Sequence, residues 1–283
     1  MKYTIKTSLL IILISTNFSF GQQSKSLRKP QDKPNIIVIY TDDHGYADMG
    51  EQGVLKDLKT PNVDALAQSG IRATSGYSTA PQCVPSRSGL LAGRFQSKFG
   101  MESNASEHSL VENENSIAKR LKKAGYVTAQ FGKWHMGKTM DIVKNGFDYI
   151  YPQNSAGKFP SNIDMNGNER PLQIYDTEGY HLETCSKAAS AIIKKHKNDP
   201  FFLYVAYRAP HVPLDAPKRY EDRFPGDMPE RRRKALAMLS AVDDGVGLIM
   251  NTLKEENLLE NTLVFYIKVF CQKVLCMTIL FLL

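Results

Sequence analysis

Three short polar stretches, each directly after an apolar run, contain the side chains most able to do chemistry. Asp42 and Asp43 follow the first run, and paired carboxylates suit Ca²⁺ or Mg²⁺, although an Asp-Asp pair is also common in turns. Lys133 and His135 follow the second run, and on an extended segment they would point the same way. His211 follows the third run, in a proline-rich turn. A lysine and histidines that converge on a crevice can bind an anion and transfer a proton.

Cys83 and Arg87 lie in a fourth stretch, Ala-Pro-Gln-Cys-Val-Pro-Ser-Arg. The second proline of this stretch is tolerated in the first turn of a helix, so Cys83 is expected at the N-terminal end of that helix, where free N–H groups and the helix dipole favour anions. The four cysteines of the chain show neither a C-x-x-C pair nor a zinc spacing. The residues therefore predict a pocket with one nucleophile candidate, one cation site and several positive groups, suited to a tetrahedral oxyanion ester.

The elements that must position these residues alternate between short apolar runs and amphipathic helical segments. Strands are predicted over residues 35–40, 126–131, 201–207 and 262–267, and helices over residues 60–68, 85–91, 116–123, 182–197 and 230–255. This alternation predicts an α/β fold with a mostly parallel central sheet and helices on both faces. In such sheets the ligand crevice lies beyond the carboxyl ends of the strands, where the polar stretches fall. Residues 151–180 are rich in Asn, Gly and Pro and predict a long loop over the site.

Five motifs in order resemble the formylglycine-dependent sulfatases of the alkaline phosphatase superfamily. Cys-Val-Pro-Ser-Arg at residues 83–87, followed by Ser-Gly-Leu-Leu-Ala-Gly-Arg, is similar to the signature of that family. The other motifs resemble its first metal segment, its next helix and its two sulfate-contacting segments, at residues 35–43, 60–64, 132–137 and 210–213. The resemblance covers residues 33–264 and implies an alkaline phosphatase-like fold and the hydrolysis of sulfate esters.

The resemblance assigns catalytic roles to Cys83, Arg87 and His135. It implies that a maturation enzyme oxidises Cys83 to formylglycine during export, and that the hydrated aldehyde attacks sulfur with one hydroxyl and releases sulfate through the other. Arg87 would stabilise the aldehyde hydrate. His135 would lie near the hydroxyl that loses its proton.

The resemblance also implies a metal site and a sulfate site. Asp42, Asp43 and the modified Cys83 would hold Ca²⁺, with Mg²⁺ as the alternative ion, and this cation would polarise the sulfate oxygens. Lys133 and His211 would bind the sulfate and assist the leaving oxygen. The implied substrate is a sulfated carbohydrate or an aryl sulfate ester.

Targeting and charge patterns indicate an exported protein. Residues 1–21 have the basic, apolar and small-residue layout of a signal peptide, and residues 22–33 predict a flexible lead-in. We therefore expect a secreted, periplasmic or extracellular protein. The net charge of +7 is mild, and no basic tract is interleaved with aromatics, which argues against nucleic acid as a partner. Residues 231–234, Arg-Arg-Arg-Lys, indicate a solvated helix face or a rim that attracts a polyanionic substrate.

The chain departs from the family pattern after the strand that begins at residue 262. Family members continue into an Asp-Asn turn that completes the metal site, and later supply another lysine and a smaller subdomain. Here residues 265–283 contain no Asp, Glu or Asn, and their apolar run is too short for a stable membrane span. The break inside a motif favours a shifted reading frame over a short anchor. The sequence thus predicts an incomplete catalytic domain over residues 34–264, a C-terminally truncated fold and an aberrant tail.

Three functions are compatible with these motifs. The first is the sulfate-ester hydrolase, with this chain expected to be inactive or poorly soluble because two carboxylates leave a calcium site short of oxygens. The second is a phosphonate or phosphodiester hydrolase of the same superfamily. The third is an inactive truncated pseudoenzyme that at most binds sulfated glycans.

Overall fold

The computed structural model describes residues 33–105, 116–269 and 277–282. The predicted signal peptide at residues 1–21 and nearly all of the predicted lead-in lie outside the described residues. Two of the four cysteines, Cys271 and Cys276, lie outside them as well.

A seven-stranded sheet forms the centre of the described fold, with strand order β2-β9-β8-β1-β7-β3-β4. Its strands are β1 (Asn35–Asp42), β2 (Ile71–Gly76), β3 (Val127–Gly132), β4 (Tyr149–Tyr151), β7 (Phe201–Pro210), β8 (Thr262–Val269) and β9 (Met277–Leu282). The five strands from β8 to β4 run parallel to one another, whereas β9 pairs antiparallel with both β8 and β2. The predicted mostly parallel α/β sheet is therefore confirmed. Strands β2, β4 and β9 were not predicted from the sequence.

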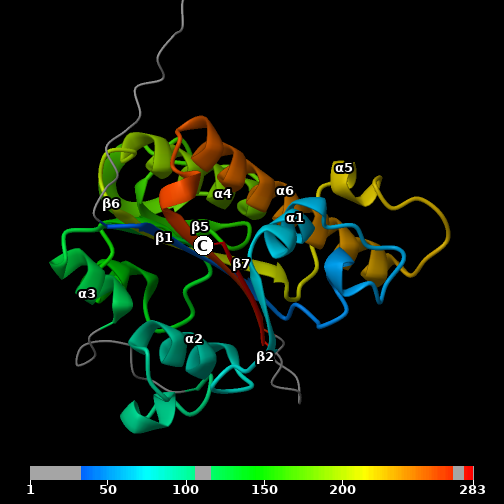
Figure 1. Cartoon of the computed structure of the whole chain (residues 1–283), viewed down its shortest axis with the longest axis horizontal. Helices are drawn as coiled ribbons and strands as arrows, with labels where there is room; N and C mark the ends of the chain where they lie inside the picture. The colour runs from blue at the N-terminus through cyan, green and yellow to red at the C-terminus, as the bar shows by residue number, and fades with distance from the viewer. Residues whose placement is uncertain (1–32, 106–115, 270–276, 283) are drawn as a thin grey trace, which may run out of the picture. The chain divides into compact units, whose positions relative to one another are not determined.

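Helices cover both faces of this sheet, as Figure 1 shows. On one face, α4 (His181–Lys195) and α6 (Glu230–Glu255) pack on alternate residues of β7 such as Leu203 and Val205. On the other face, α2 (Cys83–Ala92) and α3 (Ile117–Lys123) share a core with Phe202 and Ala206 of the same strand. A strand buried on both faces explains why β7 reads as a continuous apolar run.

The remaining helices are short. Helix α1 (Pro61–Ser69) packs against α6, and so does α5 (Lys218–Glu221), which precedes α6 in the chain. The 3₁₀ helices are η1 (Gly50–Gln52), η2 (Gln96–Phe99), η3 (Thr139–Asn145) and η4 (Leu259–Asn261). Helix α6 is long and apolar enough to cross a membrane, but 78% of its most apolar stretch is buried inside the protein, which is typical of a core helix.

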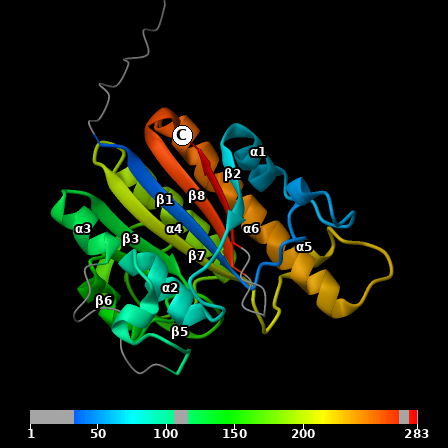
Figure 2. The same ribbon diagram turned by 60° about the horizontal axis from the view of Figure 1, so that its bottom comes forward.

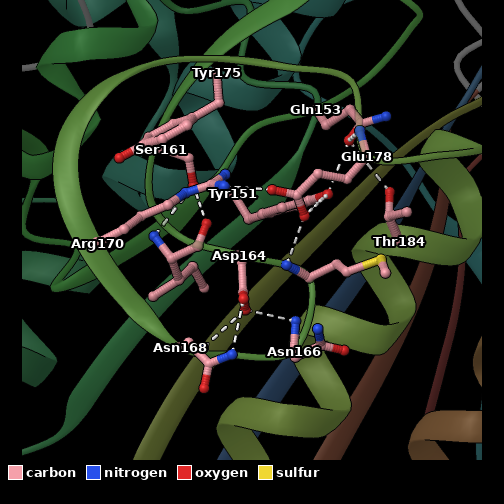
Figure 3. A network of polar contacts seen from close by, with 12 residues as sticks. Tyr151, Gln153, Ser161, Asp164, Asn166, Asn168, Arg170, Tyr175, Glu178 and Thr184 are labelled. Carbon is pink, nitrogen blue, oxygen red and sulfur yellow. Dashed lines mark hydrogen bonds and ion pairs between the residues drawn. The ribbon is translucent and has the colours of Figure 1, made fainter.

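The predicted loop over residues 151–180 is wrong, because most of it forms an antiparallel hairpin of β5 (Lys158–Ile163) and β6 (Glu169–Asp176). The turn is held by Asp164, whose Oδ1 accepts hydrogen bonds from the backbone N–H groups of Asn166 and Asn168 at 2.8 and 2.9 Å. Figure 3 shows this turn, with Arg170 reaching Glu178 nearby. The Asn and Gly residues of this segment thus build a tight turn between strands.

Strand β8 lies beside β1 and continues past the predicted domain end at residue 264. The two strands are parallel and in register, with Asn35 opposite Thr262 and Asp42 opposite Val269. Figure 2 shows β8 between β1 and the edge of the sheet where β2 lies. Residues 265–269 of the predicted aberrant tail are therefore part of the central sheet.

Candidate active site

The carboxyl ends of three neighbouring strands bring the predicted polar residues together. Asp42 is the last residue of β1, Lys133 directly follows β3, and His211 directly follows β7. Because β3, β7 and β1 are adjacent and parallel, their carboxyl ends lie side by side at the same end of the sheet. The polar stretches therefore lie beyond the carboxyl ends of the strands, as predicted.

Helix α2 places Cys83 and Arg87 at this carboxyl end of the sheet. The helix begins at Cys83, two residues earlier than predicted, and Cys83 is 4% exposed. The ligand atoms of Asp42, Cys83 and His211 all lie within 4.8 Å of one another. The ammonium group of Lys133 lies 3.8 Å from Cys83 Sγ. Four of the predicted residues thus form one compact cluster around the sulfur.

Arg87 is fully buried and held from three sides. Its Nη1 donates to Tyr204 Oη at 3.2 Å and to the Lys133 carbonyl at 3.1 Å, and its guanidinium lies 4.7 Å above the ring of Tyr40. Burial disfavours the charged form, but Tyr204 and Asp42 outweigh it and raise the pKa of Arg87. Arg87 is therefore a fixed positive charge directly behind Cys83.

Asp42 is the counter-charge of this cluster. Its carboxylate forms a hydrogen-bonded ion pair with Lys133, and its Oδ1 lies 3.3 Å from Arg87 Nη2. Burial acts to raise the pKa of Asp42, but the charges of Arg87 and Lys133 outweigh burial and lower that pKa to about 2. Asp42 therefore carries a full negative charge over the whole physiological pH range.

Asp42 and Asp43 also present oxygens that suit a hard cation. The Oδ1 atom of each carboxylate is buried and has no hydrogen-bond partner among the described residues. Such oxygens fit Ca²⁺ or Mg²⁺, which bind carboxylates in preference to softer ligands. On the neighbouring strand, the residue opposite Asp42 is Val269, whose side chain has no ligand atom. The described residues thus supply part of the roughly six to eight oxygens that Ca²⁺ takes.

His211 and His135 differ in their placement. The Nε2 atom of His211 lies 3.6 Å from Asp43 Oδ2, at the rim of the cluster. His135 is exposed and has a φ of 63°, so the predicted extended segment is wrong at this residue and the side chains of Lys133 and His135 do not share one environment. Among the described residues, no hydrogen bond or ion pair joins His135 to Cys83.

Two tyrosines belong to the site although they were not predicted from the sequence. Tyr40 and Tyr204 lie on β1 and β7 and contact the guanidinium of Arg87. Tyr40 is also 3.3 Å from Ser86 through its hydroxyl oxygen. A tyrosine inside an otherwise apolar strand needs a partner for its hydroxyl when it is buried, and that signal was available in the sequence.

Comparison with known proteins supports the family resemblance. The sequence profile of the Sulfatase family matches residues 34–267. The chain is 30% identical to Arylsulfatase J of Mus musculus over 83% of this chain and 42% of the relative, and 30% identical to N-acetylgalactosamine-6-sulfatase of Homo sapiens over 82% and 49%. The crystal structure of Ps i-CgsB superposes with a TM-score of 0.73 and 34% identity, over 83% of this chain and 58% of that one.

These matches cover most of this chain and a smaller share of its relatives. The chain spans 42% and 49% of the two curated relatives named above. The matched residues include every strand from β1 to β7 and all the cluster around Cys83. Its sheet and helices have the alkaline phosphatase-like fold of the structurally similar sulfatases. The chain therefore belongs to the sulfatase family.

Proposed function

We propose that this protein hydrolyses sulfate esters, with Cys83 as the precursor of a formylglycine nucleophile. The observation that carries this proposal is the buried cluster in which Cys83 opens a helix between Lys133, Arg87 and Asp42. A helix N-terminus with two neighbouring cations stabilises the negative charge of a bound sulfate ester and of the sulfate that is released. Membership of the sulfatase family supports the same reaction class.

The residues of the chain divide the work of such a reaction. Formylglycine supplies a hydrated aldehyde whose hydroxyl can attack sulfur. Lys133, whose ammonium lies 3.8 Å from Cys83 Sγ, is close enough to bind a sulfate oxygen next to that position. His211 is half-buried at the rim and can donate a proton to the leaving ester oxygen, which departs as the alcohol. Arg87 holds a positive charge behind the nucleophile.

A divalent cation is part of this proposal. Asp42 and Asp43 would hold it through the carboxylate oxygens that lack hydrogen-bond partners among the described residues. When bound, the cation supplies Lewis acidity that polarises a sulfate oxygen. Asp42 keeps its charge in this role because its pKa is about 2.

The proposed substrate is a sulfated carbohydrate, and the proposed location is outside the cytoplasm. A second structure of Ps i-CgsB, 35% identical to this chain over the matched residues, is a complex with k-i-k-neocarrahexaose, and a human relative is named N-acetylgalactosamine-6-sulfatase. The signal-peptide pattern of residues 1–21 would place the protein where such polymers occur. A formylglycine-forming enzyme would be its partner during export.

The test is the release of inorganic sulfate by protein co-expressed with a formylglycine-generating enzyme. The substrates are 4-nitrophenyl sulfate and a sulfated hexasaccharide, with 4-nitrophenyl phenylphosphonate as a comparison. Cys83→Ala should abolish sulfate release, whereas Cys185→Ser, a change at the other described cysteine, should retain it. Equal turnover by Cys83→Ala and the unmutated chain would falsify the proposal.

A further inference from the structure

A concave surface lies beside the loop that follows His211. It is a groove of about 260 Å³ between the loop after β7 and the first turn of α6. Its walls are formed by Val212, Leu214, Glu230, Arg231 and Lys234. We call it the α6 groove. Two cations and one anion beside apolar side chains suit a ligand that is both anionic and partly apolar.

The α6 groove is continuous in sequence with the catalytic cluster. Val212 follows His211 directly, and the carbonyl of Val212 lies 2.5 Å from His211 Nδ1. His211 in turn reaches Asp43 and lies within the set that surrounds Cys83. Val212 is 45% exposed, so this wall of the groove is accessible to a ligand. The groove therefore begins one residue beyond a member of the cluster.

The basic residues at the start of α6 do not share one structural role. Arg232 is paired with Asp48 and Asp57, and Arg233 donates to the carbonyls of Phe224 and Gly226. These two arginines hold the fold together. Arg231 is exposed, and no side chain within residues 33–105, 116–269 and 277–282 forms an ion pair with it. Contacts within the fold thus account for Arg232 and Arg233, whereas the guanidinium of Arg231 remains accessible to a ligand.

Lys234 is the second cation of the groove. It forms an ion pair with Glu230 at 2.6 Å, one helical turn earlier. This pair leaves the charge of Arg231 uncompensated inside the groove. The planar guanidinium of arginine matches the geometry of a sulfate or carboxylate better than a lysine does.

We propose that the α6 groove is a subsite for a second anionic group, a sulfate or carboxylate, on a sugar next to the one that is desulfated. Arg231 binds the anionic group directly, Lys234 adds positive charge, and Val212 and Leu214 contact the apolar face of the sugar ring. The substrate class is then a polyanionic oligosaccharide and not a compact aryl sulfate. This inference rests on the proposed sulfatase function for the identity of the reacting group.

The experiment measures binding and turnover separately on the full chain. Binding of a sulfated carrageenan hexasaccharide is measured by titration calorimetry at low ionic strength, and kinetics are measured with that hexasaccharide and with 4-nitrophenyl sulfate. Arg231→Gln should weaken hexasaccharide binding about fivefold, the size expected for an exposed charge contact. It should leave the kinetics with 4-nitrophenyl sulfate unchanged. Glu230→Gln removes the competing carboxylate and should tighten hexasaccharide binding.

The matched control is Arg120→Gln, which removes the same charge from an exposed position on α3. Equal weakening by Arg120→Gln and Arg231→Gln would show a general effect of net charge and would overturn the subsite. Hexasaccharide binding that is undetectable in the unmutated chain, or unchanged in Arg231→Gln, would also overturn it. Hexasaccharide binding that depends on Arg231 without any sulfate release would leave the subsite standing and reject the proposed hydrolase.

Discussion

Asp42 supplies the negative charge that compensates Arg87 and Lys133 in the site. It is buried and shared by Arg87 and Lys133, and a buried ion pair that loses one partner leaves an uncompensated charge. We expect Asp42→Asn to lower the free energy of unfolding by about 3 kcal/mol at neutral pH. Urea denaturation followed by circular dichroism measures this loss.

The pKa of Asp42 gives this prediction a pH dependence. Its folded pKa of about 2 lies below the ordinary value of 3.8, so its contribution is complete above about pH 4 and is lost as the pH falls through about 2. The difference between the unmutated chain and Asp42→Asn should therefore shrink over that interval. A constant difference would contradict the assigned ion pairs.

His181 predicts a second, separate pH effect. It is the buried first residue of α4, and burial, followed by the charge of Arg208, lowers its pKa from 6.5 to about 4. Between these two pH values His181 is protonated in the unfolded chain but not in the folded chain. The free energy of unfolding therefore falls as the pH decreases from about 6.5 to about 4. The loss should be about 3 kcal/mol over this range. In His181→Gln the slope of stability against pH should flatten, and an unchanged slope would exclude His181 as its origin.

At the residue scale, the sequence predicted the cluster but not its inner contacts. Asp42, Cys83 and Lys133 could be placed because strand ends and a helix start can be recognised locally. The positive φ that turns His135 out to solvent depends on the packing of Trp134 and Met136, which are fully buried on either side. Such a tertiary constraint leaves no periodic signal in the sequence.

At the scale of single elements, Gly132 sets the position of Lys133. It ends β3 with a φ of 77°, and a Cβ there would lie 2.2 Å from the Ala206 carbonyl oxygen. Gly132→Ala should lower the free energy of unfolding by about 3 kcal/mol or more, because strain and a steric clash add together. Thermal and urea unfolding measure the loss.

Gly53→Ala is the control for backbone strain alone. Gly53 has a φ of 66°, and a Cβ at this position would meet no described atom within 4 Å. The substitution should therefore lower the free energy of unfolding by only about 1–2 kcal/mol. Equal losses in the two variants would mean that the close approach of β3 to β7 is unimportant.

The β5–β6 hairpin depends on Glu178. Its Oε2 accepts hydrogen bonds from Tyr151 Oη at 3.2 Å and from the Met165 N–H at 2.8 Å, and Arg170 pairs with the other oxygen. Glu178→Ala should lower the free energy of unfolding by about 1–3 kcal/mol. It should also increase amide hydrogen exchange in the hairpin while the central strands stay protected. Glu169→Ala, at an exposed pair with Lys195, should change stability by less than about 1 kcal/mol. Uniform exchange over hairpin and sheet in Glu178→Ala would refute a local role.

This hairpin also shows where local patterns mislead. Every residue of β6 is exposed or half-buried, so the strand has no buried face that would produce a period-two alternation of apolar side chains. The strand is instead specified by its partner β5 and by the Asp164 turn. Helix α6 is the opposite case, since its apolar stripe is long enough for the predicted range 230–255 to equal the observed one.

At the scale of the whole molecule, the order of the strands could not be predicted. Strand β1 lies between β7 and β8, both of which are far away in the sequence, and β9 lies between β8 and β2. Such pairings depend on long-range contacts and not on any local pattern. The sheet type was predictable because parallel strands buried on both faces are continuously apolar.

Metal binding should be visible as a property of the whole fold. A ligand that binds only the native state raises its stability, and the partial donor set of Asp42 and Asp43 suits an affinity near the millimolar range. We expect 10 mM Ca²⁺, about ten times such a dissociation constant, to raise the melting temperature by a few degrees. The rise should disappear in Asp43→Asn and with excess EDTA. A calcium effect of the same size in Asp43→Asn would place the ion elsewhere.

The most direct single measurement is the mass of the peptide that contains Cys83. The protein is co-expressed with a formylglycine-generating enzyme, digested and analysed by mass spectrometry, with the Cys185 peptide as an internal control. The proposed formylglycine nucleophile predicts an aldehyde at residue 83 and an unmodified thiol at residue 185. An unmodified thiol at Cys83 in protein that nevertheless releases sulfate would contradict the role assigned to this residue.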